Sequence, residues 1–169
     1  MKTILILSLV LTACREVSYP VPPQRVMPKY HLNAVLELDH TRTSWPGASV
    51  VSGVLPDDQG VGWSWISPHS TVRFKLDEAA MWVFEAKITA VEAVLAKTGP
   101  QTENFLVNGH PVKTLVLDHA GSWEVQVPLP DALPADTTVE LVSEPCLAQP
   151  EGLPLCVLLH RVGFTRELR

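Results

Sequence analysis

Apolar and polar residues alternate along much of the chain from Tyr30 onward. The longest series covers 82–90, where apolar residues from Trp82 to Ala90 alternate with charged and polar ones. Such alternation is what antiparallel strands with one buried face require. Shorter alternating segments occur at 32–38, 123–129, 139–141 and 155–159. The pattern therefore predicts a domain built almost entirely of antiparallel strands.

One hairpin turn can be assigned from its residues. Asn108 and Gly109 lie between two apolar runs, and Asn-Gly is the strongest short signal for a two-residue hairpin, because both residues accept positive φ. Pro111 follows the turn and has no N–H to donate to a neighbouring strand. We therefore expect an edge strand or a wider loop after the turn.

Two short segments are candidates for helix, 77–80 and 90–97. The second is interpreted as a continuation of the preceding strand, because Thr98-Gly99-Pro100 ends it like a turn and no capping residue precedes it. The 15 prolines of the chain also disfavour long helices. Short strands separated by turn signals predict an all-β fold, an antiparallel β-sandwich of the jelly-roll type. A lipocalin-type barrel is the alternative, which would put Trp63 near the barrel base and imply an apolar ligand.

The first residues have the pattern of an export signal. Lys2 supplies a positive charge, and the apolar run over 3–10 is too short to cross a bilayer. The following Leu11-Thr12-Ala13-Cys14 resembles the lipobox of bacterial lipoproteins. The resemblance implies a signal peptide over 1–13, cleavage before Cys14 and lipid on that cysteine. An ordinary signal peptide with an incidental cysteine is the alternative.

The lipobox resemblance also implies a location and a partner. The chain would lie in the cell envelope, held on a membrane by its N-terminal lipid, since two or three acyl chains anchor a protein firmly. Arg15 stands where an aspartate would favour the inner membrane, so the outer membrane is favoured in a Gram-negative host. Residues 14–29 contain four prolines between Pro20 and Pro28, which predicts an extended linker before a β-sandwich domain over 30–169.

The cysteines agree with export. Once Cys14 is set aside for lipid, Cys146 and Cys156 remain as an even pair in an oxidising compartment. A disulfide between them would close a short loop and add about 2–3 kcal/mol of stability. Two free buried thiols are the alternative, and a metal site is disfavoured because neither cysteine lies in a C-x-x-C pair.

Charge and motifs narrow the function classes. The formal net charge of −5 becomes −6 once Lys2 leaves with the signal peptide, and no basic patch is visible, so nucleic acid is not expected as a partner. No nucleophile-elbow, zinc-protease or phosphate-loop motif is present, and His69-Ser70 does not by itself give triad geometry. We therefore expect no enzyme activity, no cofactor and no metal. The acidic run at 57–60 is interpreted as a turn, because it lacks calcium's ligand series.

A second resemblance covers residues 45–169. Gly62-Trp63-Ser64, the strand with Trp82 and Phe84, Val107-Asn108-Gly109, the run from Trp123 to Pro130, and Arg161-Val162-Gly163-Phe164 follow one another in the chain. That order is similar to galactose-binding-like jelly-roll domains, some of which are appended to bacterial glycosyltransferases and other envelope enzymes. The chain departs from the pattern at its end, where His160-Arg161-Val162-Gly163 follows the expected disulfide loop. The resemblance implies mainly the fold.

Tryptophans provide the candidate ligand site. Trp63 and Trp65 are spaced by two, near Asp57 and His69, and flat indoles stack on the apolar face of a sugar ring. Core packing is the alternative for this pair and the preferred interpretation for Trp82 and Trp123. The sequence thus predicts a membrane-anchored, non-catalytic module that binds a glycan or an envelope protein. The alternative is an accessory lipoprotein of an envelope assembly without a small ligand.

Overall fold

The computed structural model describes residues 31–37, 47–55, 61–76 and 80–167. The predicted signal peptide, Cys14 and the proline-rich linker lie outside them. Within this part of the chain, no helix has the length and apolar character needed to cross a membrane. The described residues form one short helix, α1 (Glu92–Thr98), and the strands β1 (His31–Glu37), β2 (Ala48–Val54), β3 (Ser64–Lys75), β4 (Ala80–Ala90), β5 (Gln101–Val107), β6 (His110–Leu117), β7 (Gly121–Leu133), β8 (Asp136–Glu144) and β9 (Leu158–Glu167).

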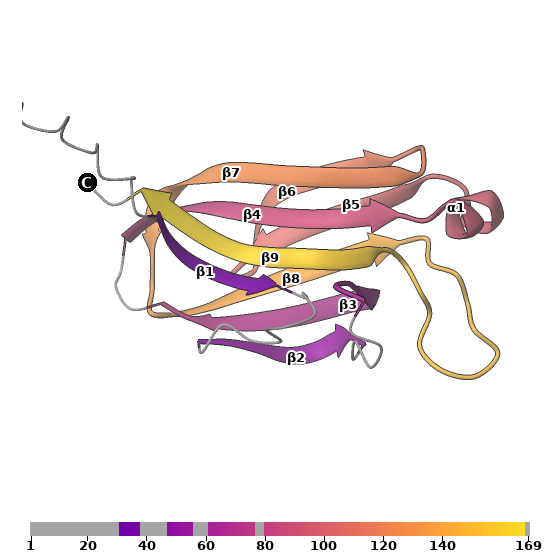
Figure 1. Ribbon diagram of the computed structural model, residues 1–169, viewed down its shortest axis with the longest axis horizontal. Coiled ribbons are helices and arrows are strands. Elements are labelled where there is room, and N and C mark those ends of the chain that lie inside the picture. The colour runs from indigo at the N-terminus through magenta and orange to yellow at the C-terminus, as the bar shows by residue number, and fades with distance from the viewer. Residues whose placement is uncertain (1–30, 38–46, 56–60, 77–79, 168–169) are drawn as a thin grey trace, which may run out of the picture.

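The strands form two layers, β1-β9-β4-β7 and β2-β3-β8-β5-β6, with antiparallel pairing in both (Figure 1). β3 belongs to both layers, because its first residues pair with β9 and its later residues with β8. No pairing joins β6 to β7 among the described strands, so the opposite side stays open. The lipocalin-type barrel is therefore wrong, and the predicted β-sandwich is confirmed.

The order of pairing identifies the sandwich as a jelly roll. With β2 left aside as an added edge strand, the remaining eight strands pair in nested fashion: β1 with β9, β3 with β8, β4 with β7, and β5 with β6. The first of these strands pairs with the last, the second with the second to last, and so on towards the middle of the chain. This nested pairing is the double Greek key of a jelly roll. The alternating segments predicted at 82–90, 123–129 and 139–141 fall within these strands, and residues 32–37 of the segment at 32–38 belong to β1, whereas residue 38 lies outside the described residues.

Aromatic side chains fill the space between the layers. Phe164 of β9 lies at the centre, with its ring centroid 5.3 Å from that of Phe74 and 6.0 Å from that of Phe84. Trp82 is 2% exposed, which confirms its prediction as core. Trp123 is half-buried and packs against the core, with its ring 4.7 Å from that of His119. The side chains that alternate inward along the strands are thus the ones that hold the layers together.

The predicted hairpin joins β5 to β6. Asn108 and Gly109 have φ of 50° and 78°, the pair of positive values that a two-residue turn of type I′ requires. The side-chain Oδ1 of Asn108 also accepts a hydrogen bond from the backbone N–H of Thr138 at 2.8 Å. β6 is an edge strand of its sheet, so the expectation from Pro111 is confirmed.

The interpretation of 90–97 as strand is wrong, because β4 ends at Ala90 and α1 follows. Val91, Val94 and Leu95 have the i, i+3, i+4 spacing of a helix face, and Val94 is buried. Gly99, with φ of 78°, ends the helix and donates its N–H to the carbonyl of Leu95. The helical spacing of these apolar residues thus decides the local structure, although the segment has no side-chain N-cap. The other helix candidate lies mostly outside the described residues, and β4 begins at its last residue.

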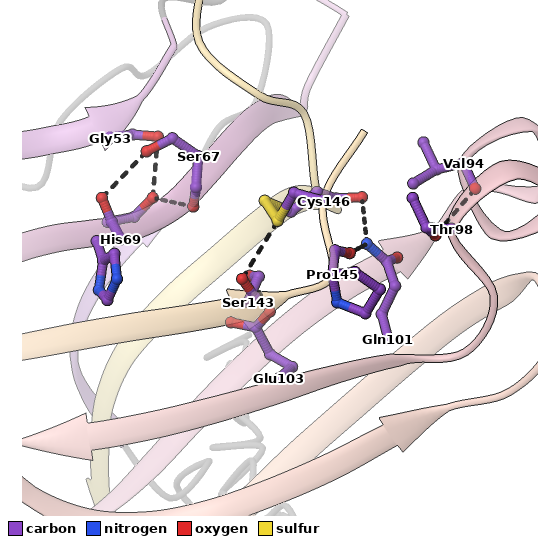
Figure 2. Close-up of a disulfide and its surroundings, with 12 residues drawn as sticks. Gly53, Ser67, His69, Val94, Thr98, Gln101, Glu103, Ser143, Pro145 and Cys146 are labelled. Atoms are coloured by element: carbon purple, nitrogen blue, oxygen red, sulfur yellow. Dashed lines mark hydrogen bonds between the residues drawn. A yellow bond between two sulfur atoms is a disulfide. The ribbon is translucent and has the colours of Figure 1, made fainter. Parts of the chain in front are cut away.

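The disulfide between Cys146 and Cys156 is present, as predicted, with an S–S distance of 1.96 Å (Figure 2). Leu147 and Leu155 form a β-bridge inside the loop that it closes. Leu155 is therefore not part of β9, which begins at Leu158, and the strand predicted over 155–159 starts later than expected.

Candidate functional site

Trp63 immediately precedes β3 and Trp65 is the second residue of that strand, and both lie on the outer face of the sandwich. Ser64 and Ile66, which alternate with them, are buried, so the two indoles point the other way. Both tryptophans are half-buried, and neither belongs to the core cluster. Their ring centroids are 6.4 Å apart with planes at 83°, an edge-to-face pair. The two rings therefore form an apolar corner that remains accessible from outside.

Backbone hydrogen bonds hold the start of β3 on both sides. The N–H of Leu55 donates to the carbonyl of Trp65 at 2.9 Å, and Trp65 is paired with Leu158 of β9. The next residue, Ile66, exchanges hydrogen bonds with the segment that follows the disulfide, since Cys156 N–H donates to its carbonyl at 3.1 Å. The backbone that carries the two indoles is thus held in place by hydrogen bonds to neighbouring segments.

A bulge in β9 brings polar side chains to the same face. Lys87 of β4 is opposite Arg161, yet Ile88 is opposite Leu159, so His160 is the extra residue. Leu159 and Val162 are both fully buried, which places His160 and Arg161 together on the outer face. Because Ser64 is opposite Leu159, the same register brings Trp63 beside His160.

His160 begins a chain of hydrogen bonds that crosses three strands. Its Nε2 lies 2.9 Å from Thr89 Oγ1 in β4, which lies 3.0 Å from Ser122 Oγ in β7. Lys87 Nζ and Glu124 Oε1 form an ion pair at 3.3 Å next to this chain. We call the surface formed by Trp63, Trp65, Thr89, Ser122 and His160 the tryptophan face.

None of the five residues of the tryptophan face is a lysine, an arginine or a carboxylate, although Arg161 lies beside His160 on the outer face. Partial burial lowers the pKa of His160, and the nearby charge of Lys87 lowers it further, although a backbone hydrogen bond with Gly62 acts in the opposite direction. The imidazole is therefore neutral at neutral pH. A neutral imidazole and a hydroxyl each donate and accept hydrogen bonds, as the hydroxyls of a sugar do. The face thus combines flat apolar rings with groups that match a polyhydroxylated ring.

The structure joins some of the predicted site residues and leaves others apart. Trp63 and Trp65 form one surface, whereas Asp57 lies outside the described residues. His69 is exposed and lies four residues beyond Trp65, on the part of β3 that pairs with β8. Its role in ligand binding stays a prediction.

Three polar residues of the tryptophan face were not predicted, namely Thr89, Ser122 and His160. Thr89 is separated from His160 by 71 positions and from Ser122 by 33. Only strand pairing brings them together, so no local sequence signal marks them. In the described parts of the chain, no group of three or more His, Cys, Asp or Glu residues is placed to hold a metal ion.

No protein-family profile matches the sequence, and no curated protein matches it. Among solved structures, a family 35 carbohydrate-binding module from an environmental isolate gives a TM-score of 0.43 at 12% identity, over 79% of this chain and 96% of that one. Tandem family 51 carbohydrate-binding modules of a family 98 glycoside hydrolase from Streptococcus pneumoniae give 0.43 at 12% identity, over 73% and 48%. Dimeric latent PorU from Porphyromonas gingivalis gives 0.40 at 11% identity, over 73% and 13%. These TM-scores all lie below 0.5, so we draw neither a family nor a ligand from them.

Proposed function

We propose that this chain is a cell-envelope lipoprotein whose β-sandwich binds a glycan without catalysis. The observation that carries the proposal is the accessible indole pair next to the hydrogen-bonded chain of His160, Thr89 and Ser122. An indole stacks on the C–H face of a pyranose, and the polar chain exchanges hydrogen bonds with its hydroxyls.

Two features support the envelope location. The Leu11-Thr12-Ala13-Cys14 segment resembles a lipobox, which would place lipid on Cys14. The disulfide between Cys146 and Cys156 favours export, because disulfides persist mainly in oxidising compartments. In this proposal residues 1–13 are removed as a signal peptide, and residues 14–29 form the linker. In a Gram-negative host the protein would be located at the outer membrane.

Glycan binding is tested with the full chain in detergent micelles on a glycan array, followed by calorimetric titration of the best ligands. Trp63→Ala and Trp65→Ala should each weaken binding roughly five- to thirtyfold, since each removes a stacking surface worth about 1–2 kcal/mol. Met81→Ala is the matched control, because Met81 is an exposed apolar side chain of β4 (58% exposed) outside the tryptophan face.

Two results would contradict glycan binding. One is the absence of any glycan ligand on the array. The other is an affinity that is unchanged in both tryptophan variants. A protein that co-purifies stoichiometrically, with no glycan response, would favour the accessory-lipoprotein function instead.

The anchor is tested separately. Cys14→Ala should move the protein from the membrane fraction to the soluble fraction, and mass spectrometry of the wild-type protein should find an acylated cysteine at the amino terminus. A variant that still fractionates with membranes, or an unmodified wild-type terminus, would exclude lipidation at Cys14.

A further inference from the structure

A cavity of about 490 Å³ opens where the edge strands β6 and β7 face each other, on the unpaired side of the sandwich. Its floor is formed by Val107, Leu129 and Leu133, which belong to the buried core. Its rim is rich in exposed prolines. A cavity of this volume accommodates a compact organic molecule.

A proline-containing bulge in β7 forms one wall. Val83 of β4 is opposite Pro128 and Met81 is opposite Ala132, so β7 advances four residues while β4 advances two. Pro128 and Pro130 both line the cavity at this bulge. Proline has no N–H to lose when pairing is interrupted, and its ring fixes φ. The wall is therefore rigid before any ligand arrives, which lowers the entropic cost of binding.

A second bulge, in β6, forms the facing wall. Phe105 is opposite Lys113, yet Leu106 is opposite Pro111, which leaves Val112 as the extra residue. Pro111 and Val112 both line the cavity. Since prolines interrupt the row of backbone donors on both edge strands, this edge does not favour addition of a peptide strand. The cavity therefore suits a compact molecule better than an extended chain.

The lining determines what kind of molecule fits. It contains no phenylalanine, tyrosine, tryptophan, lysine or arginine, and His110 contributes an imidazole ring. Valine, leucine and proline side chains present C–H groups that pack on the faces of an aromatic ring. The one acidic side chain in the lining is Asp131, exposed at the rim. Asn108 is already engaged, since its Oδ1 accepts the N–H of Thr138.

We propose that this cavity is a second binding site, which takes a small aromatic amine. The ring lies on the aliphatic floor formed by Val107, Leu129 and Leu133, and the ammonium group faces the carboxylate of Asp131. This site is independent of the glycan proposal, because none of its lining side chains belongs to the tryptophan face, although β7 contributes to both.

The site is tested by nuclear magnetic resonance on the ¹⁵N-labelled full chain in detergent micelles. The probe is 2-naphthylmethylamine, and 2-naphthylmethanol serves as its uncharged counterpart. Saturable shifts of the Val112 and Ala132 amides are expected for both, with the amine about three- to fivefold tighter, the gain typical of one exposed ion pair. Asp131→Asn should abolish that difference. Asp136→Asn, which changes an exposed aspartate outside the cavity lining, should preserve it.

A second variant tests the cavity itself. Val112→Trp fills the space and should abolish the shifts caused by both probes. If that protein does not fold, Asp131→Asn still decides the outcome, because Asp131 is exposed and its replacement spares the core. Shifts that are absent, or confined to the tryptophan face, would overturn the site. Equal affinities for the amine and the alcohol would overturn the ligand class.

Discussion

Ser143 Oγ donates a hydrogen bond to Glu103 Oε2 across the pairing of β5 with β8, in the interior of the sandwich (Figure 2). Glu103 has no exposed surface, and its Oε1 has no hydrogen-bond partner among the described residues. Burial raises the pKa of Glu103 from its ordinary 4.5 to about 8, and the hydrogen bond from Ser143 offsets only part of that rise. The carboxyl group is therefore mostly protonated at neutral pH.

This buried proton predicts how stability depends on pH. The folded state keeps the proton of Glu103 up to about pH 8, whereas the unfolded chain releases it above about pH 4.5. The free energy of unfolding should therefore fall as the pH rises through this window, by on the order of 5 kcal/mol. Urea denaturation at several pH values measures the slope. Glu103→Gln should flatten it, and Glu140→Gln, on the adjacent strand, should not. A Glu103→Gln protein with the wild-type slope would refute the assignment.

The disulfide should stabilise both the fold and the tryptophan face. Gln101 Nε2 donates to the carbonyls of Pro145 and Cys156, and Cys156 N–H donates to Ile66, next to Trp65. Replacing both cysteines by serine should lower the free energy of unfolding by about 2–3 kcal/mol. It should also weaken glycan binding, because the segment that holds the start of β3 is released. Reduction of the wild-type protein should reproduce both effects, and full affinity after reduction would separate the disulfide from the site.

Gly53 should tolerate no side chain. Its φ is 76°, and an added Cβ would lie 2.2 Å from the carbonyl oxygen of His69 and 2.6 Å from the Oγ atoms of Ser67 and Ser70. Gly53→Ala should therefore destabilise the protein by roughly 3 kcal/mol or more, as a clash adds to backbone strain. Gly109→Ala is the matched control, since its φ is 78° but no atom lies within 4 Å of the new Cβ. Thermal unfolding should show a loss of about 1 kcal/mol for Gly109→Ala. If both variants lost the same free energy of unfolding, the destabilisation would come from backbone strain alone and not from the clash.

Thr89 links the imidazole to Ser122 on the tryptophan face. Thr89→Val keeps the shape of the side chain and removes the hydroxyl that touches both neighbours. Glycan affinity should fall about three- to tenfold, the effect of one or two hydrogen bonds. Thr102→Val, on β5 outside this face, should bind as the wild type does. Titration calorimetry measures both, and an unchanged affinity in Thr89→Val would remove the polar chain from the site.

Strand placement could be predicted because side chains alternate strictly where one face is buried. The segment from Trp82 to Ala90 is the clearest case, and Asn108-Gly109 gave the hairpin because its backbone needs positive φ. The helix after Ala90 could not be predicted from its N-terminus, since Val91 offers no side-chain cap. Its i, i+3, i+4 apolar spacing was the signal that outweighed the turn-like Gly99.

The candidate site could be predicted only in its local part. Trp63 and Trp65 lie two positions apart, so the sequence places them on one face of a strand. His160 reaches that face through a bulge in β9, and a bulge depends on how two strands pair. The rim of the cavity could not be predicted from the sequence either, because Pro111 and Pro128 come from different sheets.

One edge of β9 sets the distance between the first residue of β1 and the indole pair. β1 pairs with residues 161–167 of that edge and β3 with Leu158 and Leu159. His31 is opposite Glu167 and Trp65 is opposite Leu158, so the two points lie about 30 Å apart along the strand. The proposed lipid anchor precedes His31, so the length of the sandwich would separate the point where the tether joins it from the indole pair.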